Sequence, residues 1–149
     1  MITNERQYRI TKAEAERFEG ALAKADVQGA HLDSRLSKAM REGLESQLAE
    51  LREQMAEYEA LRSGRVTVLE LDSLGELPDA LIRARIVAGL TQKELASRLG
   101  LKEQQVQRYE ATRYAGVSLA RIQAVAEVLG MGIQERVTLP SRAGKEPAA

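Results

Sequence analysis

The side chains best suited to chemistry lie within residues 91–110, TQKELASRLGLKEQQVQRYE. Amide, ammonium and guanidinium groups crowd the second half of this segment: Lys102, Gln104, Gln105, Gln107 and Arg108. Such groups bond to base edges and phosphate oxygens, and the planar fork of arginine fits the O6 and N7 acceptors of guanine. Since Gln104 and Arg108 are four residues apart, they share one face of a helix. The pattern predicts contact with duplex DNA, and the alternative for the glutamines is a solvated helix face.

Other kinds of chemistry find little support in the sequence. The chain has no cysteine, which excludes disulfides, thiolate metal sites and thiol catalysis. Its one histidine, His31, cannot by itself form a histidine-rich metal site. It also lacks a glycine-rich phosphate loop, a nucleophile paired with a base, and acids at metal-ligand spacing. We therefore expect a protein that is not an enzyme and that uses no cofactor or metal.

The polar residues need two short helices to position them. Thr91 is placed to cap a helix over residues 92–99, Gly100 supplies a left-handed turn residue, and a second helix follows from about Glu103 to Glu110. Ala96 is small where the two helices touch, as a helix-turn-helix requires. Apolar residues occupy the inward positions: Leu95, Leu99, Leu101, Val106 and Tyr109.

The N-terminal region predicts a helical hairpin. The capping-box spacing of Thr11 and Glu14 indicates a helix from Thr11 that ends at Asp26 and Gly29. A second helix of 30 residues begins near Asp33 or Ser34, ends at Ser63–Gly64 and carries an apolar stripe: Leu36, Met40, Leu44, Leu48, Leu51, Met55, Tyr58 and Leu61. At about 1.5 Å per residue it spans about 45 Å against about 22 Å for residues 11–25. The stripe is thus ordinary hairpin core, or its excess packs on the DNA-binding region, a second copy or another protein.

Two further segments connect or follow these helices. Residues 65–71 are β-branched and predict a short strand or an extended connector, and 135–139 predict a strand that pairs with 66–71. Ser73 and Glu76 again have capping-box spacing, and residues 79–131 show four short helical patterns. The fold class is mostly all-α. We divide the chain into a dimerisation or partner-binding region (1–64), a linker or short strand (65–76), a DNA-binding domain (77–132), and a short strand with a disordered tail from Pro140 (133–149).

Charge is distributed unevenly although the net charge is zero, with 22 basic and 22 acidic residues. Residues 1–64 carry 10 basic and 12 acidic side chains, whereas residues 79–131 carry 8 and 5. The positive excess coincides with the proposed DNA-binding segment. The N-terminal arginines alternate with acids and indicate solvated faces: Arg6, Arg9, Arg17, Arg35 and Arg41. No apolar run reaches about 18 residues and no signal peptide is visible, so we expect a cytoplasmic protein without membrane contact.

Residues 77–131 resemble the helix-turn-helix of the Cro and phage-repressor family, most visibly in the strings TQKELA and QRYE. The resemblance implies four or five small helices with the second helix of the motif in the major groove. It implies that Gln92 braces this helix and touches phosphate, that Gln104 and Arg108 read bases, and that Lys102 and Arg113 lie near the DNA backbone. It also implies a first helix with Leu81, Ile82, Ile86 and Leu90, and a fourth helix that Ser118 caps and that buries Leu119, Ile122, Val125, Ala126 and Leu129. Lys102, in place of the usual Ser or Thr cap, and Glu103 depart from the family pattern.

The wider arrangement resembles HigA-type antitoxins, on the strings NERQYRITKAEAERFE, YEALRSG and QRYEATRYAGVSLARI. This resemblance implies a homodimer that binds a palindromic operator in double-stranded DNA, represses its own operon and neutralises a small basic ribonuclease toxin. Acids flank the apolar stripe of the long helix and would attract such a toxin: Glu42, Glu45, Glu50, Glu53 and Glu57. The alternative is a stand-alone repressor-like regulator without a toxin partner.

Overall fold

The computed structural model describes residues 1–28 and 34–141, and every regular element in these two ranges is a helix. The helices are α1 (Glu5–Gln28), α2 (Ser34–Arg62), α3 (Leu77–Val87), α4 (Gln92–Leu99), α5 (Glu103–Ala111) and α6 (Leu119–Val128), with a one-turn 3₁₀ helix at Leu74–Glu76. The predicted mostly all-α class is confirmed. None of the described helices is long and apolar enough to cross a membrane. His31 and the chain beyond residue 141 lie outside the described residues.

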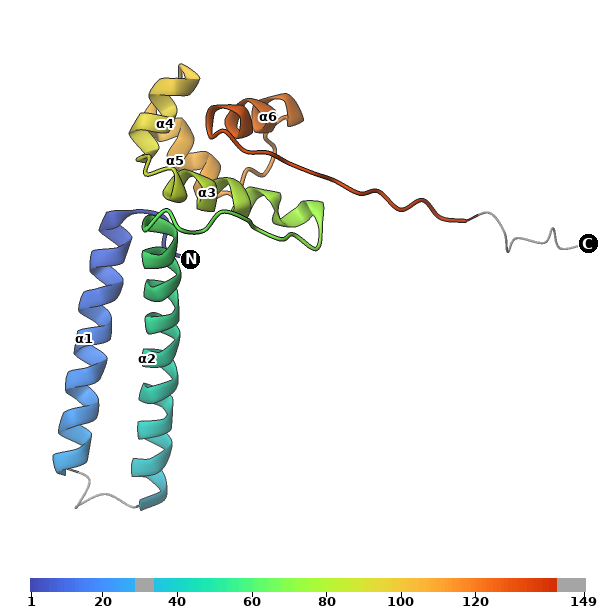
Figure 1. The fold of residues 1–149 in the computed structure, drawn as a ribbon. Coiled ribbons are helices and arrows are strands. Elements are labelled where there is room, and N and C mark those ends of the chain that lie inside the picture. The colour runs from blue at the N-terminus through green and yellow to red at the C-terminus, as the bar shows by residue number, and fades with distance from the viewer. Residues whose placement is uncertain (29–33, 142–149) are drawn as a thin grey trace, which may run out of the picture.

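Helices α1 and α2 form a long antiparallel hairpin, and the four short helices form a head domain (residues 77–131) at one end of it (Figure 1). The prediction that the first helix begins at Thr11 is wrong, because α1 begins at Glu5. The Asn4 side chain accepts a hydrogen bond from the Gln7 amide at 2.9 Å, and the Gln7 side chain accepts one from the Thr3 amide at 2.8 Å. These bonds satisfy backbone donors of the first turn.

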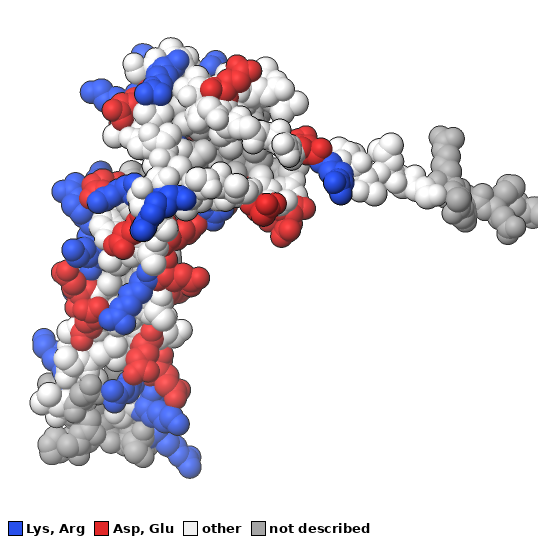
Figure 2. All heavy atoms as spheres, viewed as in Figure 1, with Lys and Arg blue, Asp and Glu red and all other residues white. Residues whose placement is uncertain are grey.

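The longer α1 changes the interpretation of the apolar stripe on α2. At about 1.5 Å per residue, α1 spans about 36 Å and α2 about 44 Å, so α1 covers most of α2 and the predicted shortfall is much smaller. Leu48, Tyr58 and Leu61 are buried, whereas Leu36 and Met40 are 54% and 55% exposed. The stripe is therefore core near the head domain and exposed surface near the far end, where basic and acidic side chains interleave (Figure 2).

The base of the hairpin and the head domain share one apolar core. Ile2, Tyr58 and Leu61 lie in the same buried cluster as Leu81 and Ile82 of α3, and this cluster extends to α4, α5 and α6. The proposed boundary at residue 64 coincides with the end of α2, but the core passes across it. Burial of this apolar surface is the main stabilising contribution to such a fold.

The strand predicted at 135–139 is absent, and of the two alternatives for 65–71 the structure has the extended connector. Residues 65–71 and 132–140 are extended without strand pairing, and the C-terminal segment leaves α6 and runs away from the body of the molecule (Figure 1). Pairing needs two segments side by side, and the chain does not bring these together. The capping box at Ser73 is also wrong, because the Glu76 carboxylate accepts a hydrogen bond from the Asp72 amide at 2.9 Å and Ser73 makes no side-chain cap.

The shared core predicts that the hairpin and the head domain unfold together. The substitution Leu61→Ala should lower the free energy of unfolding by about 2–5 kcal/mol, because it leaves a cavity in that core. Urea denaturation followed by circular dichroism should show one transition at a lower midpoint. The exposed counterpart Leu36→Ala should change stability by about 0.5 kcal/mol or less. Two separate transitions in the Leu61→Ala variant would contradict a common core.

Candidate nucleic-acid interface

Helix α4 begins and ends as the sequence predicts. The Thr91 hydroxyl accepts a hydrogen bond from the Glu94 amide at 3.1 Å, and the Glu94 carboxylate accepts one from the Thr91 amide at 2.7 Å. The Thr91 amide and the Thr91 hydroxyl both donate to the Glu94 carboxylate, and these two bonds hold the pKa of Glu94 below its usual value. Gly100 has a φ of 68° and ends the helix in the left-handed conformation, where glycine has no steric penalty.

The crossing of α4 and α5 rests on small and apolar residues, as expected. Leu95, Ala96 and Val106 are fully or almost fully buried between the helices. The chain turns tightly, with a hydrogen bond of 2.8 Å from the Leu101 amide to the Ala96 carbonyl. The second helix of the motif, α5, is thus held firmly on α4 with one face turned outward.

The polar residues of α5 fall into two groups. Lys102 stands at the N-cap without capping through its own side chain; the Gln105 side chain instead accepts a hydrogen bond from the Lys102 amide at 3.0 Å. Gln105 is half-buried and satisfies the helix start, so it lies less outward than the sequence indicates. Gln107 is exposed and donates to the Glu103 carboxylate at 3.2 Å.

Gln104 and Arg108 make up the second group. Both are exposed, and in the described part of the chain neither side chain has a hydrogen-bonding or ionic partner. They lie one turn apart on the outward face of α5. Their donors and acceptors therefore remain available for an external ligand.

A buried ion pair that the sequence analysis missed holds α5 to α3. Arg85 and Glu110 are 2% and 5% exposed, and one Arg85 nitrogen donates to a Glu110 oxygen at 2.8 Å while a second nitrogen contacts the other oxygen. Arg85 also donates to the Leu90 carbonyl at 2.8 Å and to the Thr3 carbonyl at 2.6 Å. Such bidentate, fully bonded pairs are geometrically specific.

Gln92 joins this ion pair from α4. Its side-chain amide donates to the Glu110 carboxylate at 2.7 Å, so Gln92 connects the start of α4 to the end of α5. The sequence carries a signal for this pair, because Arg85 occurs at helical spacing among Leu81, Ile82 and Ile86 on the inward face of α3. A charge in that position requires a buried partner of opposite charge.

Arg113 lies just beyond α5, where the resemblance places a contact to the DNA backbone. Its φ of 51° is left-handed, and its guanidinium pairs with the Asp79 carboxylate at the start of α3. The pair is partly exposed, so any external anion must compete with Asp79 for Arg113.

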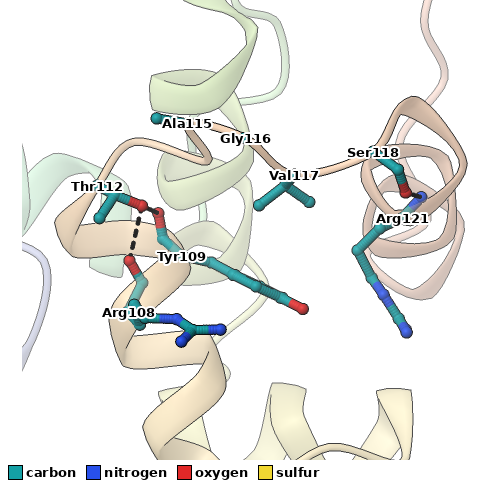
Figure 3. Close-up of a pocket in the computed structure, with 8 residues that line it drawn as sticks. All are labelled: Arg108, Tyr109, Thr112, Ala115, Gly116, Val117, Ser118 and Arg121. Carbon is teal, nitrogen blue, oxygen red and sulfur yellow. Dashed lines mark hydrogen bonds between the residues drawn. The ribbon is translucent and has the colours of Figure 1, made fainter.

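A cavity of about 350 Å³ lies between the end of α5 and the start of α6 (Figure 3). Arg108 and Arg121 stand on either side of the Tyr109 ring, and neither guanidinium has a partner in the described residues. Ser118 caps α6 as predicted, accepting from the Arg121 amide at 3.2 Å. Two cations beside a helix N-terminus favour an anion in this cavity. Leu119, predicted as core of α6, is exposed instead, which corrects that expectation.

A larger groove of about 880 Å³ lies on the other side of α5. Thr3, Arg6 and Gln7 line it from the start of α1, and Gln92 and Gln107 line it from α4 and α5. Arg6 is exposed and has no partner in the described residues, whereas Arg62, which lines the same groove, pairs with Glu5 at 2.7 Å. From the sequence alone Arg6 belongs to a solvated face, because only the fold brings α1 beside α4 and α5.

The buried ion pair predicts a large stability effect. In the substitution Glu110→Gln the Arg85 charge stays buried without its counter-charge, which should lower the free energy of unfolding by about 3–5 kcal/mol. Asp79→Asn, which breaks the partly exposed pair with Arg113, is the matched control and should cost about 1 kcal/mol or less. Chemical denaturation of both variants measures the difference, and equal effects would contradict the assignment of Arg85–Glu110 as the fixed link.

One protein-family model matches most of the head domain. The family described as Helix-turn-helix matches residues 81–136, which include α4, α5 and α6 and most of α3. Searches of curated proteins and of solved structures found no match. The match agrees with the capped α4, the left-handed glycine turn and the outward polar face of α5. Residues 81–136 are therefore similar to this helix-turn-helix family, and the similarity supports a DNA-binding transcriptional regulator.

Proposed function

We propose that this chain is an antitoxin-type repressor that binds a specific duplex operator as a homodimer, represses its own operon and neutralises a small basic ribonuclease toxin. The observation that carries the DNA-binding part is the pair Gln104 and Arg108, exposed and unpaired on the outward face of α5. A helix held rigidly by a buried ion pair can present two such side chains to base edges in a fixed register.

Phosphate contacts would flank this base-reading face on both sides. The cavity with Arg121 lies beyond the C-terminal end of α5, and the groove with Arg6 and Gln92 lies beside the start of α4. When a recognition helix enters the major groove, the two DNA backbones pass on either side of it. Lys102, exposed at the start of α5, is placed for a further phosphate, whereas Arg113 would have to leave Asp79.

A single recognition helix contacts few base pairs, so a two-fold dimer on an inverted repeat suits this domain. Half-sites about 34 Å apart would place two copies of α5 in successive major grooves on one side of the duplex. We therefore expect an inverted repeat in the promoter of the operon that encodes this chain.

The toxin contact is assigned to the far end of the hairpin. Leu36 and Met40 are exposed there although they continue the apolar stripe, and exposed apolar clusters mark protein interfaces. Electrostatic attraction supports a toxin contact less than the sequence indicates, because three of the flanking acids form ion pairs within the chain: Glu42 with Lys38, Glu45 with Arg41 and Glu57 with Arg83. Apolar contact thus contributes more to the proposed interface than electrostatic attraction.

Arg108→Ala tests base reading. The substitution should weaken binding to the cognate operator by about 1–3 kcal/mol and relax the preference at one base pair, because a bidentate contact to guanine is lost. Fluorescence anisotropy on the operator and on random duplex measures both effects. Arg121→Ala and Arg6→Ala are the phosphate controls and should weaken binding to both duplexes equally. If Arg108→Ala also weakens both equally, Arg108 contacts only phosphate.

Co-expression with the product of the adjacent reading frame tests the toxin partner. The wild-type chain should co-purify with that product, and the double substitution Leu36→Glu with Met40→Glu should abolish co-purification without changing operator binding. Ala49→Glu, an exposed residue of the same helix, is the matched control and should retain the partner. If the wild-type chain binds its operator but retains no neighbouring product, the stand-alone regulator is the correct function.

A further inference from the structure

Two extended segments of this chain lack the partner that extended backbone requires. Within the described residues, the backbones of 66–71 and 132–139 form no hydrogen bond, although both segments are rich in β-branched and aliphatic residues. An extended segment of this kind exposes a row of donors and acceptors and is a template for strand pairing.

The C-terminal segment also presents an apolar face to solvent. Side chains alternate along an extended chain, so Ile133, Val137 and Leu139 share one face, which Glu135 interrupts, and Arg136 and Thr138 lie on the other. The three apolar residues are 45%, 77% and 79% exposed. In the connector, Leu69 and Leu71 share a face and are half-buried, whereas Glu70 points the other way and is exposed.

We infer that residues 132–139 of one protomer add as an antiparallel strand to residues 66–71 of a second copy of this chain. Both halves of the pair belong to the same sequence, and the segment that follows α6 runs away from its own body rather than back to its own connector (Figure 1). Two chains that exchange these segments about a two-fold axis form two equivalent strand pairs and leave neither segment unpaired. The inference rests on the homodimer of the proposed function and names its surface.

Opposite charge favours one register between residues 66–71 and 132–139. If Glu70 of one copy faces Arg136 of the other, Leu69 faces Val137 on the opposite side of the ribbon. The opposite charges then meet on the exposed face, and the exposed valine is covered by a half-buried leucine. Neither Glu70 nor Arg136 has a partner within the part of the chain that the structure describes.

Cysteine cross-linking tests the register directly, because the chain contains no cysteine. Full-length chains with Glu70→Cys and with Arg136→Cys, carrying different tags, are mixed and oxidised. Residues that face each other across an antiparallel pair have Cα atoms about 4.5–5.5 Å apart, which a disulfide can bridge. We expect a covalent heterodimer from this mixture, and much less from Glu70→Cys with Val137→Cys, in which the adjacent residue points to the other face.

Charge reversal tests the same contact without a cross-link. Glu70→Arg or Arg136→Glu alone should raise the dimer dissociation constant by about 2- to 30-fold, as expected for two cross-strand pairs per dimer, and the two substitutions together should restore it. Sedimentation velocity measures the constants. Absence of rescue, cross-linking no greater than in the Val137→Cys control, or a wild-type chain that stays monomeric at tens of micromolar would overturn the inference. A dimer that still binds the inverted repeat in the first two cases would leave the proposed function intact.

Discussion

The buried ion pair between Arg85 and Glu110 determines how the outward face of α5, the proposed DNA-binding face, is oriented. Arg85 lies on α3, Glu110 near the end of α5, and Gln92 at the start of α4 bonds to the same carboxylate. Arg85 also holds the Thr3 carbonyl just ahead of α1. Because each of these groups is bonded and the pair is almost fully buried, small rotations of α5 would break several hydrogen bonds at once. The orientation of Gln104 and Arg108 depends on this network.

The two faces of α5 therefore carry different kinds of polar residue. Inward, Glu110 neutralises a buried cation and fixes the helix; outward, Gln104 and Arg108 remain without intramolecular partners. Gln105 belongs to neither group, because its side chain replaces the missing Ser or Thr cap at Lys102. The departure from the family pattern at Lys102 is thus compensated three residues later, at the expense of one candidate DNA contact.

The shared core makes the hairpin part of the DNA-binding unit. Tyr58 and Leu61 of α2 pack with Leu81 and Ile82 of α3, so the direction of the hairpin relative to α5 is set by close packing. This arrangement brings Arg6 beside the start of α4 and carries Leu36 and Met40 to the opposite end of the hairpin. The proposed DNA surface and the proposed toxin surface therefore lie at opposite ends of the molecule (Figure 1), an arrangement that would allow both to be occupied together.

Local signals in the sequence determined most of the helical elements. Thr91 and Glu94 cap the start of α4, Gly100 ends α4, and Ser118 caps the start of α6. Because these signals act on neighbouring backbone groups, the sequence locates α4, α5 and α6 within a residue or two. The same reasoning failed for α1, because Thr11 and Glu14 have the spacing of a cap but lie inside a helix that Asn4 already starts. Capping signals report that a helix is favourable nearby, and they do not exclude an earlier start.

Contacts between distant residues were decided only by the tertiary structure. The pairing of Arg85 with Glu110 spans 25 residues, and Arg6 and Gln92 line one groove although they are far apart in the sequence. The β-branched residues of 66–71 and 135–139 predict strands, but neither segment forms one, because a strand needs a neighbour and the fold of one chain does not supply it. Sequence determined what each segment prefers, whereas three-dimensional packing decided which segments meet, because hydrogen-bond and charge partners are set by distance in space rather than along the chain.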